Sequence, residues 1–201
     1  MPGVFVPSVP ASILNQDFVS PGEVINRVGI VYSATHLELL KKALPEREVL
    51  EKLRKNNFLL IPSPEELMSL LDLRRFTPES FDKNVWYLND QETFSLRDKV
   101  RPVWLMIRKL PVHGSEKKSW EDQLKLLYGS VHVPNVVEVA WTIIVCKKVR
   151  DLTLFSDVRV RTCSLDSDGN NVSIGVIDGK ISLGDEPSDV REDYLGLAVA
   201  S

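Results

Sequence analysis

The sequence VRVRTCSLDSDGNNVSIGVIDGKISLG, residues 158–184, decides the fold class of this chain. It holds three runs rich in alternating or β-branched residues, separated by DGNN at 168–171 and by GK at 179–180. Glycine and asparagine at such positions supply the positive φ angles that tight hairpin turns need. The stretch therefore predicts a C-terminal meander of two or three antiparallel strands.

Upstream of this meander the residue spacing is mainly helical. Ser63, Pro64 and Glu66 supply an N-cap, a proline at the first helical position and an N3 glutamate, which predicts a helix to about Leu73. Ser119 similarly predicts a helix over 120–128. Other helices are predicted at 35–44 (from Thr35 and Glu38), 45–56, at 77–79 and over 134–150, where β-branched residues leave a strand as the alternative.

Strands are predicted at 23–32, 58–61 and 85–88, and a central strand at 102–108, with a polar surface loop over 89–101. Residues 1–22 hold four of the twelve prolines and are predicted to form an irregular lead-in. We therefore expect one α+β domain over 23–201. Its sheet is expected to be mixed or mostly antiparallel, with helices packed chiefly on one face and a C-terminal β-meander.

Composition places the chain among ordinary globular proteins, since 43% of its 201 residues are hydrophobic and 26% are charged. Its net charge of -3 argues against a protein that coats nucleic acid, because such domains usually carry a basic excess. Two cysteines are too few for a disulfide framework, and Cys146 and Cys163 are predicted to be buried free thiols. The longest apolar run, 139–146, is far short of the roughly 20 residues that cross a bilayer. The first residues lack a charged n-region, so we expect a cytoplasmic, non-membrane protein.

Charge is distributed unevenly along the chain. Residues 97–150 carry eleven Lys and Arg against five Asp and Glu, whereas residues 151–201 carry four against ten. Either these two parts lie side by side and neutralise each other, or the basic part is exposed toward an anionic partner.

A basic loop over 108–120, between a predicted strand and a predicted helix, is the first candidate binding site. Loops that lead from a strand into a helix often bind anions, because helix N-terminal N–H groups favour negative charge. The candidate contacts for an anion or a nucleic acid are Arg108, Lys109, Lys117, Lys118 and Trp120. The alternative is a solvated loop followed by a core tryptophan.

Arg159 and Arg161 form the second candidate site. They alternate with Val158, Val160 and Thr162, so both guanidinium groups are predicted to project from one face of the sheet. Paired arginines at this spacing can clamp a phosphate or a carboxylate. The alternative is a solvated face with salt bridges to nearby aspartates.

Catalytic chemistry has only weak support in the sequence. His132 and Glu138 could act as an acid–base pair with the two arginines in a small hydrolase that acts on phosphoesters. However, the chain has no HExxH, GxSxG, GxGxxG or P-loop motif, and no cofactor or metal is predicted. Residues 166–170, DSDGN, resemble the start of a calcium loop, but glycine stands at the fourth position rather than the sixth. They are predicted to form a hairpin turn.

Five segments resemble a family of uncharacterised bacterial proteins. They are FLLIPSPEELMSLLDLR, VWLMIRKLPV, KSWEDQLKLL, VHVPNVVEV and VRVRTCSLDSDGNNVSIG, and the resemblance covers roughly Phe58 to Leu197. The family has no established activity, cofactor or catalytic residues, so the resemblance implies a related fold and no function.

The sequence therefore favours a non-catalytic cytoplasmic protein that binds or regulates an anionic partner, either a protein or a nucleic acid. A phosphoester hydrolase is the first alternative. The second is a subunit of a larger assembly, which predicts an exposed apolar patch around Trp86, Tyr87 or Trp104.

Overall fold

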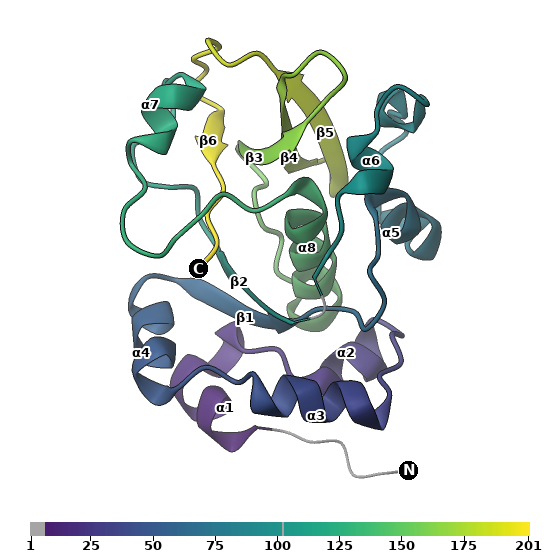
Figure 1. Cartoon of the computed structure of the whole chain (residues 1–201), viewed down its shortest axis with the longest axis vertical. Coiled ribbons are helices and arrows are strands. Elements are labelled where there is room, and N and C mark those ends of the chain that lie inside the picture. The colour runs from purple at the N-terminus through teal and green to yellow at the C-terminus, as the bar shows by residue number, and fades with distance from the viewer. Residues whose placement is uncertain (1–6, 102) are drawn as a thin grey trace.

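The buried helix α8 (Val136–Arg150) is the hub of the computed structural model, which describes residues 7–101 and 103–201. It contacts α2 (Pro21–Arg27), α5 (Leu70–Phe76) and strands of two different sheets. Every residue from Val136 through Cys146 is buried, as expected for a helix that is apolar on nearly all sides. Residues 134–150, for which the sequence left a strand open, therefore supply the central helix (Figure 1).

Two sheets flank this helix. Strands β1 (Phe58–Pro62) and β2 (Trp104–Arg108) form an antiparallel pair, so the strand predicted as central has one partner strand. The second sheet has the order β5-β4-β3-β6, in which β3 pairs antiparallel with β4 and parallel with β6. The fold is thus one α+β domain with the predicted C-terminal meander. The remaining strands are β3 (Arg159–Leu165), β4 (Asn171–Ile177), β5 (Lys180–Glu186) and β6 (Leu195–Leu197).

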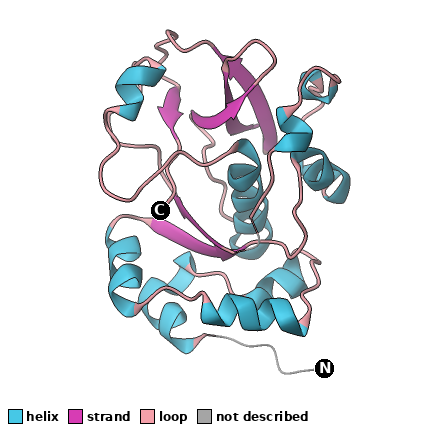
Figure 2. Ribbon diagram, viewed as in Figure 1, coloured by secondary structure: helices cyan, strands magenta, loops and turns pink. Residues whose placement is uncertain are grey.

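The N-terminal helices and the four-stranded sheet lie at opposite ends of the long axis, with the two-stranded sheet between them (Figure 2). These helices are α1 (Ser8–Leu14), α2, α3 (Ala34–Lys42) and α4 (Arg47–Lys55). The helix predicted over 45–56 and the strand predicted over 58–61 are therefore confirmed as α4 and β1.

The prediction of an irregular lead-in is wrong for the described residues 7–22. They form α1, the short 3-10 helix η1 (Asn15–Asp17) and the start of α2, and Ile13, Leu14 and Phe18 are buried. The N–H of Val19 donates to the carbonyl of Leu60 at 3.0 Å, which ties this segment to β1. Prolines suggested irregular structure, but apolar side chains between them join the core. Residues 1–6 of the predicted lead-in lie outside the described residues.

The strand predicted at 23–32 is also wrong, because this segment begins with helix α2. Ser20 and Glu23 form a capping box, in which the N–H of Ser20 donates to Glu23 Oε2 at 2.8 Å. Pro21 occupies the first helical turn, where its missing N–H costs nothing. The β-branched residues of this segment suggested a strand, but the capping residues determine the structure.

The helix predicted from Ser63 begins later, at Leu70, after the N-cap Ser69. Ser63 instead donates its hydroxyl to the Val103 carbonyl, and Glu65 accepts from the N–H and the hydroxyl of Ser33, both at 2.6 Å. Ser33 is the N-cap of α3, in place of the predicted Thr35 start. The motif therefore joins neighbouring elements rather than starting its own helix.

Two other local predictions need correction. Residues 85–88 form the 3-10 helix η3 (Trp86–Leu88) rather than a strand, because Tyr87 turns into the core and Trp86 lies against the four-stranded sheet. The predicted surface loop over 89–101 includes α6 (Phe94–Arg97), and Phe94 and Val100 are fully buried. The turn predicted at 77–79 is the 3-10 helix η2 (Pro78–Ser80).

Candidate functional site

The two faces of the four-stranded sheet have different compositions. Val160, Ile174 and Leu183 are paired across three strands and are buried on the face toward α8. The opposite face carries polar and small residues, because side chains alternate along each strand. On this face Ser173 of β4 lies between its cross-strand neighbours Arg161 of β3 and Gly184 of β5. Gly175 of β4 pairs with Ser182 of β5 and lies beside Arg159 of β3.

Arg161 lies on the closed half of this polar face. Its side chain is fully buried, and its guanidinium donates to the carbonyls of Lys118, Pro187 and Val190 and to Gln123 Oε1 at 2.9–3.2 Å. Gln123 belongs to helix α7 (Trp120–Leu124), Lys118 lies just before this helix, and Pro187 and Val190 lie in the segment after β5. Burial lowers the pKa of Arg161, and the nearby Glu186 and Asp189 oppose this effect. Arg161 thus has a structural role and is closed to ligands.

Arg159 lies on the open half of the same face, stretched across two glycines. A Cβ at Gly184 would overlap Nη1 of Arg159, and a Cβ at Gly175 would lie 3.2 Å from its Cγ. The absence of a Cβ at Gly184 and Gly175 lets this side chain lie flat on β4 and β5. Its Nη2 donates to Ser182 Oγ at 2.9 Å, and no ion pair involves Arg159 among the described residues.

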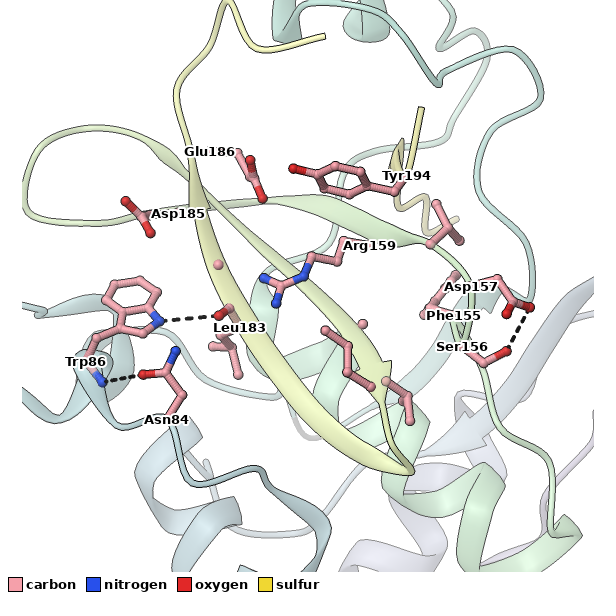
Figure 3. Close-up of a pocket in the computed structure, with 15 residues that line it drawn as sticks. Asn84, Trp86, Phe155, Ser156, Asp157, Arg159, Leu183, Asp185, Glu186 and Tyr194 are labelled. Carbon is pink, nitrogen blue, oxygen red and sulfur yellow. Dashed lines mark hydrogen bonds between the residues drawn. The ribbon is translucent and has the colours of Figure 1, made fainter. Parts of the chain in front are cut away.

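A pocket of about 690 Å³ opens above Arg159 (Figure 3). This volume falls within the usual range of small-molecule sites, roughly 300–1,000 Å³. The walls come from the segment before β3, from β4 and β5, from the residues near η3 and from Tyr194. In Figure 3 the guanidinium group lies near the middle of the labelled side chains.

Three carboxylates border this single cation. Glu186 is buried and accepts from Ser173 Oγ at 3.0 Å, whereas Asp157 and Asp185 are exposed at the edge of the pocket. Desolvation and the charges of Glu186 and Glu192 raise the pKa of Tyr194. Its hydroxyl is protonated at neutral pH, as an ordinary tyrosine is, and can donate a hydrogen bond. The pocket therefore offers a guanidinium, a phenol and several carboxylates at close quarters.

Trp86 and Asn84 complete the pocket on the β5 side. The indole N–H of Trp86 donates to the Leu183 carbonyl at 3.3 Å, and the Trp86 ring packs against Phe94 with centroids 5.7 Å apart. Asn84 Oδ1 accepts from the N–H of Trp86 at 3.4 Å. These contacts fix the wall, so an indole in the pocket can report binding by fluorescence.

The structure does not gather the predicted basic loop into one cationic surface. Lys109 pairs with Asp17 at 2.8 Å, Lys117 pairs with Asp193 at 3.9 Å, and Trp120 packs against the core. Lys118 contributes its carbonyl to Arg161, and Arg108 lines a separate groove beside α4. The basic and acidic parts are in contact at Lys117 and Asp193, which favours the neutralising interpretation of the charge asymmetry.

The structure places His132 near Glu138, where a positive charge on His132 opposes the rise in the pKa of Glu138 that burial causes. Glu138 is buried in the capping box of α8, where its Oε2 accepts from the N–H of Asn135 at 3.0 Å. His132 is exposed and its backbone pairs with Ala200, while Arg159 and Arg161 are bonded to the groups named above. None of the hydrogen bonds that Arg159 and Arg161 donate within the described part of the chain goes to His132 or Glu138.

The other predicted features have simpler roles. Residues 166–170 form the hairpin turn, in which Asp166 Oδ1 accepts from the N–H groups of Asp168 and Asn170. Cys146 is buried as predicted, whereas Cys163 is exposed. Tyr87 and Trp104 are buried, so the apolar patch expected of an assembly subunit is not present at these two positions.

Sequence reasoning identified Arg159 and missed the residues around it. Gly175 and Gly184 were visible as glycines within predicted strands, a signal that often marks close approach of another group. Tyr194 and Glu186 carried no local pattern, since only the folded sheet brings them to Arg159.

Comparison with known proteins identifies no relative. The chain matches no family model, no curated protein and no solved structure. Within residues 7–101 and 103–201, no helix is long and apolar enough to span a bilayer, and no group of three or more His, Cys, Asp or Glu side chains could hold a metal ion.

Proposed function

We propose that this chain is a non-catalytic cytoplasmic binding protein, and that its site is the Arg159 pocket rather than the basic loop. The observation that carries the proposal is the state of Arg159. Two glycines leave room for its side chain to lie flat at the floor of an open pocket, Ser182 Oγ accepts from its Nη2, and it forms no ion pair within the described part of the chain. A guanidinium group that forms no ion pair within the protein can bind a carboxylate or a phosphate of a ligand.

The surroundings of Arg159 favour a small ligand over a nucleic acid. A phosphate backbone presents many negative charges and is bound by several cations. Here one arginine stands among Asp157, Asp185 and Glu186, so a polyanion would be repelled by the carboxylates that border the pocket. One anionic group of a small molecule can reach Arg159 without approaching all three of them.

The proposal is tested by NMR titration with sodium acetate and, separately, with inorganic phosphate at constant ionic strength. The backbone N–H signals of Gly175 and Gly184 are the reporters, because both glycines lie beneath the Arg159 side chain. We expect saturable shifts with at least one anion, and their loss in Arg159→Gln. Arg191→Gln is the matched control, since Arg191 is exposed and pairs with Asp122 on α7. Signals that stay in place, or that move equally in Arg159→Gln, would contradict the proposal.

A further inference from the structure

The charges around Gly184 define the ligand of this pocket more closely. A Cβ at Gly184 would overlap Arg159 Nη1 and would lie 3.2 Å from Glu186 Oε1, so the cation and the carboxylate flank the same residue. No ion pair between them is present among the described residues. Opposite charges that are adjacent but not joined leave room for a ligand that touches both.

A free α-amino acid has the matching arrangement, with a carboxylate and an ammonium group on one carbon. Its carboxylate can accept from the Arg159 guanidinium while its ammonium donates to Glu186. Each contact needs a donor–acceptor distance of roughly 2.7–3.2 Å. Because the two ligand groups are close together, they suit two protein groups that flank a single glycine.

The rest of the pocket selects the side chain of that amino acid. Among the described residues that line the pocket, Arg159 is the only Lys or Arg, against the three carboxylates of Asp157, Asp185 and Glu186. The charged lining therefore has an excess of negative charge. The α-groups of the ligand neutralise each other, and complementarity then favours a positive side chain. The volume of about 690 Å³ leaves space for a long one beyond the α-groups.

We infer that the Arg159 pocket binds a free α-amino acid with a basic side chain, held between Arg159 and Glu186. This inference rests on the proposed function, because it assigns the carboxylate of the ligand to Arg159. It adds a second binding residue, Glu186, for the α-ammonium of the ligand. It also assigns the preference for a basic side chain to Asp157 and Asp185.

The test is isothermal titration calorimetry with L-lysine, L-norleucine, L-glutamate and acetate. We expect lysine to bind roughly two- to fivefold more tightly than norleucine, which has a similar chain without the second ammonium, and glutamate to bind more weakly than either. Asp157 and Asp185 are exposed, and an exposed ion pair corresponds to about this ratio. The indole of Trp86, which lines the pocket, gives a second readout by fluorescence.

Two variants distinguish the contribution of Arg159 to binding from that of Glu186. Arg159→Gln should weaken lysine and acetate together. Glu186→Gln keeps an acceptor for Ser173 Oγ and should weaken lysine and norleucine but not acetate. Asp178→Asn is the control, because Asp178 lies in the β4–β5 turn with φ 50°, a conformation that asparagine also adopts.

The possible outcomes distinguish failure of the amino-acid inference from failure of the proposed function. If acetate binding depends on Arg159 but lysine binds no more tightly than acetate, the amino-acid inference is overturned and the proposed function stands. Lysine binding that is unchanged in Glu186→Gln also overturns the inference alone. If none of the four compounds binds but inorganic phosphate gives the saturable shifts described above, the inference alone is overturned. If phosphate also fails to bind, or if Arg159→Gln binds every compound as well as the original chain does, both the inference and the proposed function fail.

Discussion

Arg159 and Arg161 lie two residues apart on one strand and face the same side of the sheet, but their environments are opposite. Arg161 is buried and donates four hydrogen bonds, to Lys118 just before α7, to Gln123 in α7 and to two carbonyls of the segment after β5. Arg159 is partly exposed, donates one side-chain hydrogen bond to Ser182 and borders an open pocket. An arginine on a sheet face becomes a structural link when the chain folds over it, and a candidate binding group when the face stays open.

The largest expected difference between the two arginines is in stability. Arg161→Met should lower the free energy of unfolding by roughly 3–5 kcal/mol, because buried carbonyls and Gln123 lose their charged donor. Arg159→Met should lower it by less than about 1 kcal/mol, since only the bond to Ser182 is lost. Urea denaturation of both variants measures these values. Equal losses would show that the two arginines do not differ in the way described.

A second prediction concerns the glycines beneath Arg159. Gly184→Ala should cost about 1 kcal/mol in unfolding free energy, because Arg159 Nη1 must turn away from the new Cβ and the Arg159 side chain then loses its bond to Ser182. In an Arg159→Ala background the cost should fall by about 0.5–1 kcal/mol, measured as a double-mutant cycle. Gly175→Ala is the comparison variant and should couple more weakly. Its Cβ would lie 3.0 Å from the backbone oxygen of Val158, which Arg159→Ala leaves in place, and 3.2 Å from Arg159 Cγ, which Arg159→Ala removes. If the double-mutant cycle shows no coupling energy between Gly184→Ala and Arg159→Ala, Gly184 does not make room for the Arg159 side chain.

A smaller effect is expected at Glu138, a buried carboxyl at the start of α8. Burial raises the pKa of Glu138 above its usual value, and the N–H of Asn135 partly offsets this. A raised pKa means that the folded state favours the protonated form, so its contribution to stability is complete below about pH 4.5 and is lost as pH rises through the folded pKa.

Glu138→Gln removes this titration and keeps an acceptor for the N–H of Asn135. The difference in unfolding free energy between the variant and the original chain should therefore shift in favour of the variant as pH rises from 4 to 8, by about 1 kcal/mol or less. Thermal unfolding across that range measures it. A difference that is flat with pH would show that Glu138 is better stabilised by its partners than its burial implies.

Much of the fold follows from local signals, and the errors have identifiable tertiary causes. The hairpin turns of the meander and the helix of 134–150 were predicted, because glycine turns and an apolar helical stripe act locally. The helix start at Ser63 was predicted wrongly, because Ser63 and Glu65 bind Val103 and Ser33, which lie far away in sequence. Long-range partners of this kind leave no mark in the local pattern.

In the candidate site, too, the features that depend on local sequence were predicted and those that depend on distant residues were not. Alternation along 158–162 correctly places both arginines on one face, since it depends only on the strand period. Which of them is covered depends on α7 and on residues 187–190, and nothing near Arg161 in sequence indicates that cover. Lys109 and Lys117 looked like free cations for the same reason, because Asp17 and Asp193 are distant along the chain.

The most direct test of the central claim is an NMR measurement of the arginine side chains during an acetate titration. The Nε–H signals of Arg159 and Arg161 are assigned by their loss in Arg159→Gln and Arg161→Lys. The Nε of Arg161 is buried, so its signal should stay in place. The Arg159 signal should move and saturate as acetate occupies the open half of the face. An Arg159 signal that does not move, or an Arg161 signal that moves as far, would contradict the assignment of binding to Arg159 and of structure to Arg161.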